Sequence, residues 1–137
     1  MLHHKFLEKY SNASKLFGME ITAANSEIGE LEASFDAKAI FTNTAGNIQG
    51  GILTAMLDDL MGYALGITLP PTQFAPTANL NVSFLRPVTI GRLHGKGLIL
   101  KKEEQVYHLA AKLYNTQGEL LASATSKSKA MYKTVLR

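Results

Sequence analysis

The sequence contains no cysteine and no long hydrophobic run. Without cysteine, the chain can form no disulfide bond and offers no thiolate nucleophile or zinc–thiolate site. The first residues, MLHHKFLEKYSN, lack the apolar core of a signal peptide, and no later run reaches the roughly 18 apolar residues that a membrane span needs. We therefore expect a soluble, cytoplasmic protein that is not embedded in a membrane.

Strong charge and the common cofactor motifs are also missing. The formal net charge is only +3, and the basic residues are scattered except near the end of the chain. So mild a bias does not favour nucleic-acid binding and better suits a small polyanionic ligand. The sequence has no P-loop, GxGxxG, GxSxG or HExxH pattern, which disfavours nucleotide hydrolysis, triad esterase chemistry and a metal site. We expect no cofactor.

Length and composition favour one globular domain spanning residues 1–137, because 46% of the residues are hydrophobic and the chain is too short for two cores. Apolar residues at helical spacing predict a short amphipathic helix over residues 3–17. Alternating patterns predict strands, the first two joined as a hairpin that turns at Asn25 to Gly29. These strands are expected at residues 19–23, 31–35, 78–84, 92–100, 106–114 and 120–132, with KKEE and NTQGE as the last two connections.

Residues 51–67 predict a long central helix, because they are rich in Leu, Met and Ala and contain few β-branched residues. The apolar side chains leave little of its circumference for water, so we expect this helix to be buried nearly all round. Strands precede and follow it in the sequence. This order predicts an α+β fold in which a curved antiparallel sheet wraps around the helix.

Asp58 and Asp59 stand side by side in the middle of this apolar helix. An unpaired ionised carboxylate is costly to bury, and burial commonly raises the pKa of an acid toward neutrality, where it suits proton transfer. Thr54 and Gly62 flank Asp58 at helical spacing and are small, which leaves room for a ligand. Asp59 has the larger Tyr63 at that spacing. A purely structural role in hydrogen bonds or salt bridges stays open for Asp58 and is favoured for Asp59.

Gly50 and Gly51 open the same helix. The first N–H groups of a helix lack partners and lie at the positive end of its dipole, so they would stabilise a carbonyl oxygen that gains negative charge. Glycine lets a ligand approach closely, although a Gly-Gly pair also serves as a simple turn. Together with a carboxylate eight residues later, the pair indicates a site.

These residues resemble a known family. Asn43, Gly50-Gly51, Asp58 and the segment TANLNVSFLRP are similar to the motifs of the hotdog-fold acyl-CoA thioesterases of the phenylacetate-degradation type, over about residues 40–132. The resemblance implies a hotdog fold and the hydrolysis of small to medium or aromatic acyl-CoA. It also implies a homodimer, often arranged as a dimer of dimers.

The resemblance further implies a role for each matching residue. Asn43 and the backbone N–H of Gly50 would polarise the thioester carbonyl, and Asp58 would act as base or nucleophile. Thr77 would help to orient the attacking water. Gln49 stands where the family usually has histidine, so the side-chain hydrogen bonding of the turn is altered while the main-chain donor remains.

The phosphates of CoA need cations, and basic residues at strand ends are candidates to bind them. Each could equally be a solvated charge on an edge or loop. The candidate substrate-binding residues are Arg86, Lys101, Lys102 and Lys129, together with Gln49 and Gly51 at the turn.

Spacing along the helix predicts the oligomer. Gly50 and Asp58 lie roughly 12 Å apart at a rise of about 1.5 Å per residue, so both cannot touch one reacting carbon. If both serve one thioester, a second subunit must bring its antiparallel helix alongside. We therefore expect a two-fold dimer in which Asn43 and Gly50 come from one chain and Asp58 and Thr77 from the other.

Two other functions stay open. A hydratase or dehydratase of acyl thioesters on this fold typically pairs an Asp with a His, and no histidine stands near Asp58. A non-catalytic module that holds acyl-CoA, as a sensor or storage protein would, is compatible with Gln49 in place of histidine. Thiol release by an Asp58→Asn variant would separate these functions from hydrolysis.

Overall fold

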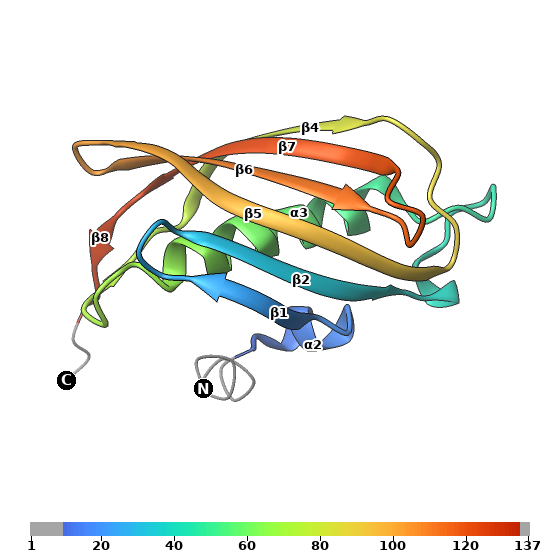
Figure 1. Ribbon diagram of the computed structural model, residues 1–137, viewed down its shortest axis with the longest axis horizontal. Helices are drawn as coiled ribbons and strands as arrows, with labels where there is room; N and C mark the ends of the chain where they lie inside the picture. Colours follow the sequence, from blue (N-terminus) through green and yellow to red (C-terminus); the bar gives the residue numbers. More distant parts are fainter. Residues whose placement is uncertain (1–9, 135–137) are drawn as a thin grey trace.

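The computed structural model describes residues 10–134 (Figure 1). Its elements in chain order are α2 (Asn12–Leu16), β1 (Glu20–Asn25), β2 (Glu30–Ala37), a short 3-10 helix (Ala39–Phe41), α3 (Gly50–Gly66), β3 (Gln73–Phe74), β4 (Thr77–Phe84), β5 (Gly91–Glu103), β6 (Val106–Tyr114), β7 (Leu120–Lys129) and β8 (Met131–Tyr132). Six strands form one antiparallel sheet in the order β1-β2-β5-β6-β7-β4, and β3 pairs with β8.

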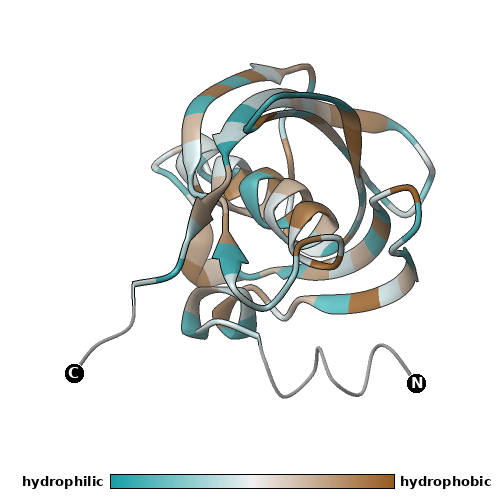
Figure 2. Ribbon diagram, turned by 90° about the vertical axis from the view of Figure 1, so that its left-hand side faces the viewer, coloured by the Kyte–Doolittle hydropathy of each residue, from teal (hydrophilic) through white to brown (hydrophobic). Residues whose placement is uncertain are grey.

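The sheet curves around α3, which is seen nearly end-on inside the ring of strands in Figure 2. Met56, Leu57 and Leu60 of the helix are fully buried, as are Phe35 and Leu113 of the sheet. Burying such side chains contributes about 1.5–3 kcal/mol each, so this layer supplies much of the driving force for folding. The predicted α+β plan of a sheet wrapped around one central helix is confirmed.

Two glycines in β5 let the helix approach the sheet closely. A Cβ atom on Gly97 would overlap the main-chain carbonyl of Leu60, and one on Gly95 would overlap the Leu60 side chain. The backbone of α3 therefore rests directly on β5. Any larger residue at Gly97 would have to push the helix away from the core.

The expectation that α3 is buried nearly all round is wrong. Gly51, Gly62 and Gly66 are exposed, and Asp58 is partly exposed. These positions follow one another at helical spacing along one side of α3, which the strands of the same chain leave uncovered. We call the side defined by Gly51, Asp58, Gly62 and Gly66 the open side of α3.

The amino-terminal helix also differs from its prediction. The start of the predicted helix, before residue 10, lies outside the described residues, and α2 begins at Asn12. Ala13 and Leu16, two of the apolar residues at helical spacing, are exposed, whereas Ser14 is fully buried. Ser14 faces the interior because its hydroxyl donates a hydrogen bond to Asp59 of α3.

The strand ends shift as well. The KKEE stretch is not a connection, because β5 continues to Glu103 and the turn is made at Glu104, whose φ is 56°. The predicted last strand is interrupted at Ala130, where β7 gives way to β8. The first hairpin is confirmed, since β1 and β2 pair antiparallel around the predicted turn, with a bulge between Ile21 and Ala23.

Strand β4 is an edge of the sheet, with β7 on one side and no other strand of residues 10–134 on the other. Leu80 and Val82 pack against the core as expected. The single apolar face predicted for residues 78–84 is incomplete, because a bulge between Thr77 and Asn79 interrupts the alternation and leaves Ala78 exposed. Phe84, at the other end, is 53% exposed.

Candidate functional site

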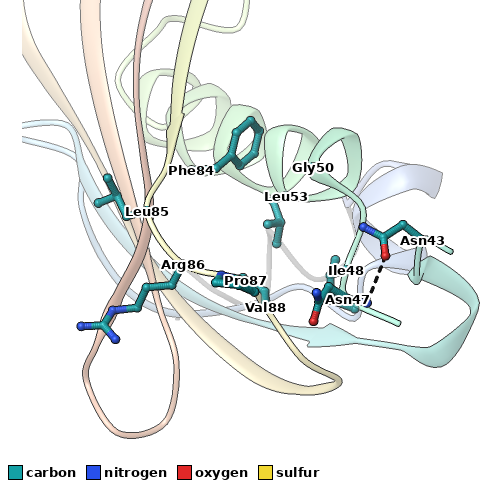
Figure 3. Close-up of a pocket in the computed structure, with 10 residues that line it drawn as sticks. All are labelled: Asn43, Asn47, Ile48, Gly50, Leu53, Phe84, Leu85, Arg86, Pro87 and Val88. Carbon is teal, nitrogen blue, oxygen red and sulfur yellow. Dashed lines mark hydrogen bonds between the residues drawn. The ribbon is translucent and has the colours of Figure 1, made fainter. Parts of the chain in front are cut away.

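A cavity of about 360 Å³ lies at the amino end of α3 (Figure 3). The loop before the helix forms one wall, and the end of β4 with the segment after it forms another. The cavity is lined by Asn43, Asn47, Ile48, Gly50, Leu53, Phe84, Leu85, Arg86, Pro87 and Val88. Asn43 and Gly50, which the sequence predicts to share one carbonyl oxygen, thus border the same space.

The side chain of Asn43 is held by the loop that it begins. Its Oδ1 accepts hydrogen bonds from the backbone N–H groups of Ala45, at 3.0 Å, and Asn47, at 3.1 Å. Two donors to the oxygen fix the orientation of the amide, so its NH₂ group is the free end. In Figure 3 this nitrogen lies on the side of the amide nearer the start of α3.

The amino terminus of α3 is left without a side-chain cap. Gln49 is the N-cap residue, and its side chain makes no capping hydrogen bond. Its carbonyl accepts from the N–H groups of Ile52 and Leu53, at 2.9 and 3.3 Å. The N–H groups of Gly50 and Gly51 precede these and have no partner within the helix. A Cβ atom at Gly50 would lie 3.2 Å from the Phe84 ring, so glycine keeps this approach open.

Asp58 and Thr77 meet on the open side of α3. The Thr77 hydroxyl donates a hydrogen bond of 2.8 Å to Asp58 Oδ1. Thr77 is the first residue of β4, so the pair joins the middle of the helix to the start of the edge strand. Asp58 is partly exposed and Thr77 is exposed, so this carboxylate is accessible from outside the chain.

One chain therefore holds these two pairs of residues at separate places. Neither Asp58 nor Thr77 lines the cavity that contains Asn43 and Gly50. The two groups are eight residues apart on α3, about 12 Å along the helix. The four predicted catalytic residues fall into the two pairs that the sequence predicted, within one chain.

A second cavity, of about 420 Å³, begins one helical turn beyond Asp58. This cavity, which is formed by the end of α3, the proline loop after it and Lys133, was not predicted from the sequence. The signal that could have found it is the apolar pair Phe74 and Ala75 just before Pro76. Its lining consists of Gly62, Leu65, Gly66, Leu69, Pro70, Pro71, Gln73, Phe74, Ala75 and Lys133.

The four predicted phosphate-binding cations do not form one cluster in the chain. Arg86 lines the cavity at Gly50 and forms an ion pair with Glu119 at 3.0 Å. Lys101, Lys102 and Lys129 lie toward the other end of the sheet, where Val106 pairs with Lys129 and Thr77 with Ser128. Lys101 pairs with Glu103 at 3.2 Å, and the Lys102 ammonium lies 5.3 Å from the centre of the Tyr107 ring.

Asp59, for which the sequence favoured a structural role, is partly buried and points toward α2. Burial raises its pKa to about 6, the hydrogen bond from Ser14 opposes this rise, and the charge of Asp58 adds to it. The Ser14 Oγ to Asp59 Oδ2 distance is 2.9 Å. The expected structural hydrogen bond is therefore present.

Among residues 10–134, no three His, Cys, Asp or Glu side chains are grouped so that they could hold a metal ion. Within the same residues, no helix is both long enough and apolar enough to span a membrane.

Comparison with known proteins bears on the family. Residues 45–122, more than half of the chain, match the family model of the thioesterase superfamily. A phenylacetic acid degradation-related protein of Ralstonia eutropha is 33% identical and has a TM-score of 0.85, and the match covers 93% of this chain and 98% of that chain. A protein of Saccharolobus solfataricus, named provisionally as an esterase, is 26% identical over 118 residues, which are 85% of this chain and 84% of that protein.

The fold has further solved relatives. The Escherichia coli PaaI protein from the phenylacetic acid degradation operon is 19% identical, with a TM-score of 0.85 over 98% of this chain and 95% of its own. At this identity the likeness concerns the fold alone. It confirms the hotdog fold that the sequence predicted.

Proposed function

This chain belongs to the thioesterase superfamily and is a thioester hydrolase, and on that premise we propose that it hydrolyses small to medium or aromatic acyl-CoA at two sites shared by a two-fold dimer. The observation that carries the proposal is the division of the site. Asn43 and Gly50 border one cavity, while Asp58 and Thr77 form a hydrogen-bonded pair on the open side of the same helix.

A second copy of the chain would complete each site. The open side of α3 lies beside β4, whose outer edge is unpaired within residues 10–134. A copy docked with its α3 and β4 antiparallel to the first would cover both features. Symmetry about a point near Thr54 then brings the partner's Asp58 beside Gly50, because residues 50 and 58 are equally far from residue 54.

In this dimer the substrate carbonyl would accept hydrogen bonds from the Asn43 amide and the Gly50 N–H, each worth roughly 3 kcal/mol in the transition state. The partner's Asp58, held by Thr77, would take a proton from water as the water oxygen bonds to the carbonyl carbon. Attack by the carboxylate itself is the alternative route. The carbon–sulfur bond then breaks, and the CoA thiolate leaves and takes up the proton.

The two cavities support the assignment of the substrate ends. The same symmetry places the cavity at Gly62 of one chain next to the cavity at Gly50 of the other. Leu65, Leu69 and Phe74 give the former an apolar wall. We assign the acyl group to this cavity, whose volume of about 420 Å³ falls within the usual range for small-molecule sites.

Thiol release from a panel of acyl-CoA substrates tests the chemistry. Asp58→Asn keeps an acceptor for Thr77 and should lower kcat about a thousandfold, and Thr77→Val about tenfold, with KM little changed. Asp36→Asn, on β2, is the matched control and should leave kcat unchanged. Saturable acyl-CoA binding without turnover in the wild type would favour a binding module, and full activity of Asp58→Asn would remove Asp58 from the mechanism.

Mixed dimers test the sharing of sites. An Asp58→Asn chain and an Asn43→Ala chain are each expected to be inactive alone. A dimer of one of each contains one intact site, so an equal random mixture should recover about a quarter of the wild-type activity. If light scattering showed dimers but no activity returned, the Asn43 and Asp58 of one site would come from the same chain.

A further inference from the structure

The second cavity, at the carboxyl end of α3, has a single charged residue in its lining. Lys133 is that residue, and the lining contains no aspartate or glutamate. Gln73 contributes an amide, and every other lining residue is apolar or glycine. Lys133 is exposed, so its charge lies at the rim. A ligand that fills this cavity therefore meets apolar walls and one cation.

The backbone holds Lys133 at this place. The chain leaves the large sheet at Ala130, whose N–H donates to the carbonyl of Gln105 at 2.8 Å, and continues as β8 (Figure 1). β8 pairs with β3, and the Lys133 N–H then donates to the carbonyl of Thr72 at 2.9 Å. So short a pair of strands adds little stability by itself. Its result is to fix the lysine against the proline loop.

The charge of Lys133 is not used within the chain. In the described part of the protein, no carboxylate forms an ion pair with it. A cation could also stabilise the negative end of the α3 dipole. However, the carbonyls of Tyr63 and Leu65 already accept from the N–H groups of Ile67 and Thr68, at 3.1 and 2.9 Å. The ammonium group is therefore available to a ligand.

We propose that the preferred acyl group carries a carboxylate at its far end, and that Lys133 binds this carboxylate at the rim of the second cavity. The inference rests on the proposed function, in which the thioester carbonyl lies beside Asp58 and the acyl group enters this cavity. It names the class of substrate as an acyl-CoA of a dicarboxylic acid.

The length of the acyl group follows from the helix. Gly62 and Gly66 line the cavity and lie about 6 and 12 Å beyond Asp58 along α3. A Cβ atom at either glycine would meet nothing within 4 Å, so this path is open. At about 1.2 Å per bond, an extended chain covers that distance in roughly five to ten bonds. A carboxylate much closer to the thioester would instead be repelled by Asp58.

The expected preference is modest. The methylene groups of the acyl chain would pack against Leu65, Leu69 and Phe74, and the carboxylate would accept a charge-assisted hydrogen bond from the Lys133 ammonium. Because Lys133 is exposed, water and salt weaken this ion pair. We expect the carboxylate to raise kcat/KM about fivefold at low salt. An acyl group without it still fills the apolar part.

Thiol release from suberyl-CoA and octanoyl-CoA measures the preference. The two substrates share the same chain length and the same CoA, so contacts with the phosphates cancel in the ratio of their kcat/KM values. Wild type should favour suberyl-CoA at low salt, and the preference should shrink in concentrated salt. Malonyl-CoA should gain nothing over propionyl-CoA, because its carboxylate cannot reach Lys133.

Variants of Lys133 assign the preference to this residue. Lys133→Met removes the charge and keeps an unbranched side chain, so it should lower kcat/KM for suberyl-CoA about fivefold and leave octanoyl-CoA unchanged. Lys133→Arg should retain the preference, and Lys133→Glu should reverse it. Lys112→Met is the control, since Lys112 is exposed on β6 and lines neither cavity. Circular dichroism shows whether each variant is folded.

Each failure has its own meaning. Equal losses with both substrates in Lys133→Met would mean that Lys133 supports the fold or holds the CoA phosphates, and would overturn the inference. Hydrolysis of octanoyl-CoA and suberyl-CoA at equal rates by the wild type would also overturn it, while leaving the proposed function intact. Thiol release from neither substrate would overturn the proposed function itself.

Discussion

The two sides of α3 differ in burial and in the size and polarity of their residues. On the side that faces β5 and β2, Leu57 and Leu60 are fully buried and the helix backbone rests on Gly95 and Gly97. On the open side, the residues are small, polar or both, and Asp58 reaches outward to Thr77. The covered side fixes where the helix lies, and the open side carries the chemistry that we propose.

This difference separates the side of α3 that builds the fold from the side that, as we propose, a second copy of the chain completes. The covered side satisfies its apolar surface within the chain. Beside the open side, the outer edge of β4 is unpaired within residues 10–134, two cavities open at the ends of α3, and the partly exposed Asp58 carboxylate contacts Thr77. A substitution should therefore act on stability when it lies on the covered side, and on assembly and activity when it lies on the open side.

A matched pair of glycine substitutions tests whether the covered side controls stability and the open side does not. Gly97→Ala forces a methyl group into the carbonyl of Leu60, and we expect it to lower the free energy of unfolding by about 3 kcal/mol or more. Gly62→Ala meets no atom within 4 Å and removes a helix-interior glycine, so the chain should gain up to about 1 kcal/mol. Denaturant titration measures both.

The same pair also separates stability from assembly. If a second copy covers the open side, Gly62→Ala should weaken the dimer and reduce activity while the isolated chain is no less stable. Analytical ultracentrifugation over a concentration series would show the change. Equal losses of stability in the two variants would contradict the distinction between the two sides.

Asp59 gives a smaller effect that depends on pH. Its pKa is raised in the folded chain, to about 6, so the folded state favours the neutral carboxyl. This contribution to stability is present below the unfolded pKa and is lost as pH rises through about 6. Asp59→Asn, which does not titrate, should exceed the wild type by about 2 kcal/mol at pH 8 and by almost nothing at pH 4. Urea unfolding at both pH values measures this, and a constant difference would refute it.

Much of the fold could be predicted from the sequence because it depends on short-range patterns. Alternation predicted the β1–β2 hairpin, and a long segment rich in Leu, Met and Ala predicted α3. The pairing of Asn43 with Gly50 and of Asp58 with Thr77 was also expected, from a resemblance that spans most of the chain. The roles of these residues remain predictions.

The failures share a physical cause, because each depends on residues that are distant in the sequence. Ser14 is buried where its hydroxyl donates to Asp59, which lies 45 residues away, so helical spacing alone could not show which side of α2 is buried. The sequence could not show that one side of α3 is open. The number of apolar residues in a helix does not reveal whether strands of the same chain cover each of its sides. The turn at Glu104 needs a positive φ that no sequence signal marked.

Substitutions of the basic residues should give the smallest effect. They test whether opposite ends of β4 from two chains meet at one site. Arg86 lies at the Gly50 cavity and Lys129 near the start of β4, at opposite ends of that strand in one chain. Antiparallel docking would bring them to the same shared site. Both are exposed, so each contact with a phosphate is worth little and is screened by salt. Arg86→Gln and Lys129→Gln should each raise KM for acyl-CoA about threefold at low salt.

An acyl thioester of N-acetylcysteamine, which lacks the phosphates, distinguishes charge from structure. Its KM should be unchanged in both variants, because no anion remains for the cations to hold. Lys96→Gln is the control, since Lys96 pairs with Glu30 on another part of the sheet, at 3.3 Å. If only Arg86 raised KM for acyl-CoA, the two ends of β4 would not meet at one site. The comparison between a covered side and a side completed by a partner would then hold for the helix but not for the strand beside it.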